Sequence, residues 1–248
     1  MEEGRNIRLD LAYDGGRYHG WQRQKKAITI QALLEDKLQT ILGEAIILTA
    51  AGRTDAGVHA LNQTCNFRTD SKLNPGTIRR ALNALLPDDI LINRAFYVTQ
   101  NFHARYGAKA KTYEYRLLNR PEPDIFLRYY TWHIPQELDL AAMEACLPIL
   151  RGLHDFSSFK STGSGIKNPV RDMLRAELVR GVEGRVTLVF QADGFLRHMV
   201  RNIVGTLVQV GRGRLDPGGF GRILDAKDRQ AAGKKSPPQG LFLKGVQY

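Results

Sequence analysis

The chain has 248 residues, of which 43% are hydrophobic, so it is long enough for one large domain or two small ones with buried cores. Its 36 lysines and arginines exceed its 25 aspartates and glutamates by 11, and this charge predicts a polyanionic partner, nucleic acid before an anionic membrane surface. No apolar run approaches the about 20 residues that cross a bilayer, and the first residues hold no apolar signal segment. We therefore expect a cytoplasmic protein without a membrane anchor.

The cysteines and histidines indicate no metal or cofactor site. Cys65 and Cys146 are too far apart for a Cys-x-x-Cys motif, and the six histidines lack the spacing of metal ligands. Residues 233–236 resemble a phosphate-binding loop only in part, because the first glycine is missing and two prolines follow. We expect neither a bound metal nor a nucleotide cofactor.

The first half of the chain begins with two segments of regular hydrophobic spacing. Apolar residues alternate from Ile7 to Tyr13, which predicts a strand. A three-to-four spacing from Ile30 to Leu42 predicts a helix with Thr29 as its N-cap. The other elements expected in this half are strands over 45–50, 62–67 and 90–98 and a helix over 75–86.

The second half shows the same mixture of strands and helices. The elements expected there are strands over 108–118, 173–180, 185–192 and 241–246, helices over 139–150 and 197–210, and a surface loop over 230–239. Each half then has strands with two helices packed on them. This pattern predicts two α+β subdomains with a boundary between residues 102 and 109.

The segment from Ala51 to Ala60 combines an acid, a histidine and two glycines. Gly52 and Gly57 flank Asp55, and glycines permit backbone angles and close approaches that favour a carboxylate held toward a ligand. The alternative is a turn in which polar side chains only accept backbone hydrogen bonds. For this segment taken alone, the alternative is the better interpretation.

Three other segments carry candidate functional groups, each with a structural alternative. In residues 13–24, aromatic rings alternate with basic and amide groups, which suits RNA but also a half-buried loop closed by a tryptophan. Tyr113 shares a strand face with two lysines, although a tyrosine in a strand usually serves packing. Arg201 follows Arg197 by one helical turn, and it needs an acidic partner or a ligand if buried, unless it reaches solvent from the helix end.

The order and spacing of these segments resemble the tRNA pseudouridine synthase A family. The likeness rests on Gly-Arg-Thr-Asp-Ala-Gly-Val-His at 52–59, Lys-x-Tyr-x-Tyr at 111–115 and Phe-Leu-x-His-Met-Val-Arg-Asn-Ile-Val-Gly at 195–205. Shorter matches at 13–15, 20–24, 102–105, 155–159, 226–229 and 240–243 extend it over essentially the whole chain. Departures lie in the variable loops, notably 122–128 and 161–168, so they concern fine RNA contacts rather than chemistry.

The resemblance implies an α+β fold in which two similar α/β subdomains form a shared mixed, mainly antiparallel sheet flanked by helices. Residues 1–105 would carry the acidic turn, and residues 106–248 the tyrosine strand and the arginine helix. The implied activity is isomerisation of uridine to pseudouridine at positions 38, 39 and 40 of the tRNA anticodon stem-loop. The implied enzyme is a homodimer that binds tRNA and needs no cofactor.

The resemblance also assigns roles to single residues. Asp55 is the nucleophile, Arg201 pairs with it, and Tyr113 stacks on the target base. The remaining substrate contacts are assigned to Arg53, His59, Arg23 and Arg105, whereas Thr54 is expected to be structural. A site closed around a base would disfavour an ionised carboxylate, and the arginine would oppose that effect.

Two other functions remain as alternatives. The first is a non-catalytic RNA-binding or tRNA-folding module on the same scaffold. The second is a hydrolase that uses Asp55 to cut a glycosidic or phosphate bond. Whether Asp55 attacks the sugar or the base is open.

Overall fold

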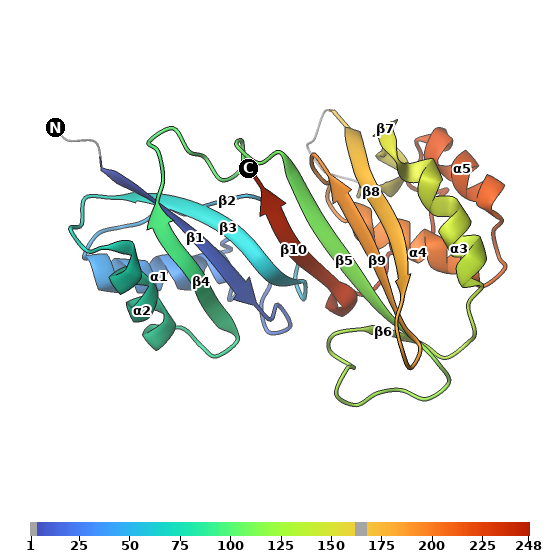
Figure 1. The fold of residues 1–248 in the computed structure, drawn as a ribbon, viewed down its shortest axis with the longest axis horizontal. Helices are drawn as coiled ribbons and strands as arrows, with labels where there is room; N and C mark the ends of the chain where they lie inside the picture. Colours follow the sequence, from blue (N-terminus) through green and yellow to red (C-terminus); the bar gives the residue numbers. More distant parts are fainter. Residues whose placement is uncertain (1–3, 162–167) are drawn as a thin grey trace. The chain divides into compact units, whose positions relative to one another are not determined.

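The computed structural model describes residues 4–161 and 168–248. The chain forms two compact units (Figure 1). Unit 1 runs up to Lys109 and includes Phe242–Tyr248, and unit 2 is Ala110–Leu241. Most of the variable segment expected at 161–168 lies outside the described residues.

The sheet of unit 1 is built around its first strand. β1 (Arg5–Tyr13) pairs antiparallel with β3 (His59–Thr69) and with β4 (Ile90–Tyr97). β2 (Thr49–Ala50) lies antiparallel to β3, and β10 (Leu241–Gln247) lies parallel to it. The alternating apolar residues of β1 are buried, as expected for a strand that packs on a core.

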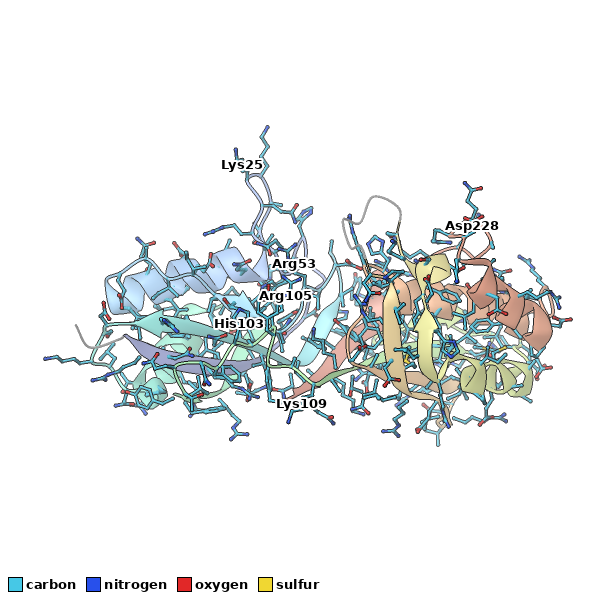
Figure 2. All side chains as sticks on the ribbon, turned by 90° about the horizontal axis from the view of Figure 1, so that it is seen from above. Lys25, Arg53, His103, Arg105, Lys109 and Asp228 are labelled. Atoms are coloured by element: carbon cyan, nitrogen blue, oxygen red, sulfur yellow. The ribbon has the colours of Figure 1, made fainter. Side chains whose placement is uncertain are left out.

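Two helices complete unit 1, and Figure 2 shows α1 (Ile30–Leu42) covering one face of the sheet. α1 buries its three-to-four stripe and ends at Gly43, whose φ of 74° suits a left-handed helix cap. Thr29 occupies the expected N-cap position, but its side chain makes no capping bond, so that detail of the prediction is wrong. α2 (Pro75–Leu85) is capped by Asn74, which accepts the Thr77 N–H.

Unit 2 has a second, mainly antiparallel set of strands. β9 (Arg185–Ala192) lies between β5 (Ala110–Asn119) and β8 (Val170–Arg180), and β7 (Gly152–Asp155) pairs with β8. The parallel strand β6 (Trp132–Ile134) adds to β5. The described helices are α3 (Leu140–Cys146), α4 (Met199–Gly211) and α5 (Pro217–Ala226), with short 3-10 turns at Leu147–Leu150, Ser157–Phe159 and Pro238–Gly240. The expected fold class, a mixed and mainly antiparallel sheet flanked by helices, is confirmed.

Several predicted boundaries are wrong. No strand covers 45–48, and the helix expected over 139–150 ends at Cys146, before Pro148 enters a 3-10 turn. α4 starts two residues late because His198 takes a left-handed conformation, with φ of 63°. Arg197 therefore precedes the helix and does not lie one helical turn from Arg201.

Among the described residues, none of the helices has the length and hydrophobicity needed to cross a membrane. Within the same residues, no cluster of three or more His, Cys, Asp or Glu side chains is placed to hold a metal ion.

Candidate active site

Asp55 lies in unit 1 on a turn between β2 and β3. The turn is anchored at its start, where the Ala51 N–H donates to the carbonyl of Thr64 (2.8 Å). It closes where the Val58 N–H donates to the carbonyl of Asp55 (3.1 Å). Ala51 and Val58 are buried, Asp55 is partly exposed and Arg53 is exposed. The carboxylate of Asp55 is therefore partly accessible on a short loop whose two ends are buried. This loop, residues 51–58, is here called the acid turn.

A glycine loop packs directly on the acid turn. Gly20 has φ of 84°, and a Cβ added there would lie 2.5 Å from the Thr54 carbonyl oxygen. The N–H of Trp21 donates to the same oxygen (3.0 Å). Gly15 packs on the C-terminal end of the turn, because a Cβ added at Gly15 would lie 1.9 Å from the Val58 carbonyl oxygen. Only glycine permits such backbone approach, so both positions define the shape of the acid turn.

His59 is buried behind the acid turn, at the start of β3. Its Nδ1 lies 3.1 Å from the N–H of Gly15 and 2.9 Å from a carboxylate oxygen of Asp14. Nδ1 would accept the first contact if it carries no proton and donate to the second if it does, so the tautomer or charge of the ring selects between them. The imidazole also stacks on Phe242, with ring centroids 4.6 Å apart. This placement suits the part of its predicted role that holds the loop.

The tyrosine and tryptophan rings of residues 13–24 are buried. Tyr13, Tyr18 and Trp21 are all at most 5% exposed, which confirms the half-buried loop with a tryptophan plug and excludes base stacking on these rings. The basic side chains of the segment remain outside. Arg23 is exposed and forms an ion pair with Glu35 (2.8 Å), and Figure 2 shows Lys25 at the far tip of the loop.

Arg105 lies on a second rigid turn of unit 1, here called the cationic turn (residues 102–107). The buried Ala104 fixes it, because its N–H donates to the Asn66 side chain (2.9 Å) and its carbonyl accepts the Tyr248 hydroxyl (2.8 Å). His103 Nδ1 accepts the backbone N–H groups of the two residues that follow Ala104. The backbone of the cationic turn is therefore held from within the unit.

The cationic turn exposes an aromatic ring that was not among the residues predicted from the sequence. Tyr106 is 78% exposed, with its ring 4.4 Å from that of His103 and 5.6 Å from the guanidinium of Arg105. Figure 2 labels His103 and Arg105 on this turn. The available signal was the aromatic residue that directly follows Phe-His-Ala-Arg and precedes a glycine.

Unit 2 contains the predicted tyrosine and arginine. Tyr113 lies in β5, opposite Phe190 of β9, and is nearly buried with its ring 5.0 Å from Phe195. Arg201 lies in α4 and is 7% exposed, so the alternative in which it reaches solvent from a helix end is wrong. Its Nε donates to the Ser236 carbonyl (2.8 Å), and Ser236 N–H donates back to the Arg201 carbonyl (3.1 Å).

The predicted site residues thus fall into two groups. The structure brings Asp55, Arg53 and His59 together in and behind the acid turn, and it places Arg23 and Arg105 in the same unit. Tyr113 and Arg201 belong to unit 2. The pairing of Asp55 with Arg201 and the stacking role of Tyr113 stay predictions.

A basic α+β protein that holds a carboxylate on a braced glycine turn fits the class of RNA-modifying enzymes. A family model described as tRNA pseudouridine synthase matches residues 11–107 and 148–248. The chain therefore belongs to the tRNA pseudouridine synthase family.

Curated relatives agree with this family over almost the full length. The chain is 43% identical to tRNA pseudouridine synthase A of Thermoanaerobacter sp. strain X514 over 98% of its own length and 100% of the relative. It is 42% identical to the protein of that name from Acetivibrio thermocellus, with the same coverage. For the Geobacillus sp. strain WCH70 protein, identity is 43% and 98% of each chain is covered.

Proposed function

We propose that this protein isomerises uridine to pseudouridine in tRNA, at positions 38, 39 and 40 of the anticodon stem-loop. The observation that carries the proposal is the acid turn, a braced and accessible carboxylate inside the region that matches the tRNA pseudouridine synthase family. The excess of positive charge suits an RNA substrate. We also propose that the enzyme works in the cytoplasm as a homodimer.

Asp55 acts as the nucleophile in this proposal. Its carboxylate bonds to the target nucleotide, the N1–C1′ bond of the uridine breaks, and the base turns and rejoins through C5. The hydrogen lost from C5 is replaced by one gained at N1, so the product has the mass of the substrate. A carboxylate suits the reaction because it can form a covalent intermediate and then leave.

The target uridine must leave the RNA stack before Asp55 can reach it, and Tyr113 would replace part of the lost stacking. An aromatic face contributes about 1–3 kcal/mol per stacked base. Arg201 would keep the nucleophile ionised in a site from which water is excluded. Within unit 2, the bond from its Nε to the Ser236 carbonyl holds the guanidinium in place.

The exposed basic residues of unit 1 would contact the tRNA backbone. Arg53, Arg23 and Arg105 are exposed, and the first of them lies on the acid turn itself. His59 would act from behind the acid turn, by holding the backbone that carries Asp55. Phosphate contacts of this kind make affinity fall steeply with salt.

The decisive variant is Asp55→Asn, which removes the nucleophile and changes little of its shape. We expect it to abolish pseudouridine formation in unmodified tRNA while tRNA binding stays within about twofold of the wild type, since phosphate contacts supply most of the affinity. Pseudouridine is measured by chemical labelling with reverse transcription, and binding by filter retention.

The same assay separates the alternatives. A non-catalytic module would leave wild-type reactions without pseudouridine, and a hydrolase would release uracil or cleaved RNA, which mass spectrometry distinguishes from a mass-neutral product. Turnover by Asp55→Asn would contradict the nucleophile assignment. Mapping pseudouridine in tRNA from cells lacking the protein, with and without a rescuing copy, identifies the modified positions.

A further inference from the structure

A buried hydrogen bond lies directly under the acid turn. The hydroxyls of Tyr13 and Thr54 are 2.8 Å apart, and both residues are buried. Tyr13 reaches this place because the pairing of β1 with β3 shifts register after Leu11 and sets Tyr13 opposite Ala60. Burying a hydroxyl without a hydrogen-bond partner costs free energy, so this contact is a specific interaction of the core.

A second buried side chain holds the start of the acid turn. Gln63 is fully buried in β3, and its amide nitrogen donates to the Gly52 carbonyl (2.8 Å). Its amide oxygen accepts the N–H of Thr64 (3.1 Å), which fixes the orientation of the amide group. The backbone is therefore anchored at Gly52 and again at Thr54, on either side of Arg53.

Thr54 is held on two sides. Its hydroxyl contacts the Tyr13 hydroxyl, and its carbonyl accepts the Trp21 N–H (3.0 Å). Gly20 packs closely against the same carbonyl. Because that carbonyl belongs to the peptide that leads into Asp55, the two contacts together fix the plane of this peptide. The direction in which the Asp55 side chain leaves the backbone follows from that plane.

We propose that Tyr13 is a positioning residue for Asp55, acting through the Thr54 hydroxyl. This assignment rests on the proposed function of Asp55 as a nucleophile. A tyrosine needed only for packing would be replaceable by phenylalanine, whose ring fills the same space. Phenylalanine here would leave the Thr54 hydroxyl buried without this partner and free the peptide before Asp55 to rotate.

The protonation state of the Tyr13 hydroxyl suits a residue that holds Thr54 at all working pH values. Burial raises the pKa of Tyr13 well above its ordinary value, and the hydrogen bonds from Thr54 and Gln63 oppose this only in part. The hydroxyl therefore stays protonated at neutral and moderately alkaline pH. The support should act equally at every pH at which the enzyme works.

The test compares Tyr13→Phe, Thr54→Val, the double variant and Thr54→Ser. Single-turnover pseudouridine formation at saturating tRNA gives the rate, and tRNA Kd and Tm are measured beside it. We expect either single variant to lower the rate about 10- to 100-fold, because a small misplacement of a reacting group costs that much. Kd should change less than about twofold, since phosphate contacts remain.

The pattern among these variants separates positioning from general damage. The double variant should lose no more than the worse single variant, since both remove the same bond. Thr54→Ser keeps the hydroxyl and should retain at least about half of the wild-type rate, as expected if the hydroxyl is the active feature. Tyr18→Phe is the matched control, because it removes a tyrosine hydroxyl that bonds to Asp89 and keeps the backbone bond between Tyr18 and Gly57 of the acid turn.

Tyr13→Phe with a wild-type rate would overturn the proposal. So would a rate loss that follows Tm or Kd, or an equal loss in Tyr18→Phe, because each indicates a structural role. Wild-type protein that forms no pseudouridine would instead overturn the proposed function, and this assignment with it.

Discussion

The acid turn and the cationic turn are built alike and present different chemistry. Each is a short backbone segment in unit 1, anchored by buried partners that include Thr64 for the first and Asn66 for the second. The acid turn offers a carboxylate with glycine backbone packed beneath it, whereas the cationic turn offers an exposed ring and a guanidinium. The main task of each turn, reaction for the first and binding for the second, thus follows from the side chains that it presents.

The comparison predicts that the acid turn affects the rate constant of pseudouridine formation and that the cationic turn affects the tRNA dissociation constant. Backbone variants that distort the acid turn but keep Arg53 should lower the rate of pseudouridine formation and leave tRNA affinity unchanged. Variants of the cationic turn should weaken tRNA affinity and leave the rate at saturating tRNA unchanged. An effect on both constants from either turn would break this division.

The largest effect is expected from Gly20→Ala. The new Cβ would meet the Thr54 carbonyl at 2.5 Å and would also occupy a left-handed conformation, so the acid turn must shift. We expect the single-turnover rate to fall by about 100-fold. The left-handed strain alone costs about 1–2 kcal/mol of stability, measured by denaturant unfolding.

Gly43→Ala is the control for Gly20→Ala. Gly43 has a similar φ, but a Cβ there would have no neighbour within 4 Å. Gly43→Ala should show the loss of stability without the loss of rate. Equal rates for the two variants would show that the close approach of Gly20 does not shape the acid turn.

Tyr106→Ala should act on tRNA affinity instead of rate. If a base of the tRNA stacks on this ring, its removal costs about 1–3 kcal/mol, or about 5- to 150-fold in Kd. Tyr106→Phe should bind as the wild type does. The control is Tyr97→Ala, because Tyr97 is another exposed tyrosine of unit 1 with an arginine near its ring. Equal losses in both alanine variants would argue against a specific stacking site.

The smallest effect is expected from Arg105→Gln, and salt dependence reveals it best. Loss of one phosphate contact should make the slope of log Kd against log salt shallower by about 0.7–0.9. Tyr106→Ala should leave that slope unchanged, since stacking releases no counterions. An unchanged slope in Arg105→Gln would place this guanidinium away from the phosphates.

Hydrophobic spacing predicted much of the fold. The alternation in β1 and the three-to-four stripe of α1 are strong local signals, and both elements were found with their ends nearly right. β6 and β7 were missed because strands of three and four residues are too short for a period to register. α5 was missed because its Pro-Gly-Gly start is typical of a loop.

The candidate site was predictable only as far as residue types allow. Asp55 and its glycines stand out within one short segment, but the support of that segment comes from elsewhere. Tyr13 and Thr54 are 41 positions apart, and neither residue type signals a buried hydrogen bond. The rings of residues 13–24 fitted RNA stacking and packing equally well until their burial decided for packing.

The last strand, β10, contributes a contact behind the acid turn that can form only after nearly the whole chain has been synthesised. Phe242 of β10 lies opposite His59 in the parallel pairing with β3 and stacks on its imidazole. These partners are separated by most of the chain, so the backing of the acid turn is incomplete until residue 242 has been synthesised. Long-range pairing of this kind forms late and slowly. A nascent chain would therefore carry the acid turn for most of its synthesis without the aromatic ring that stacks on His59 behind it.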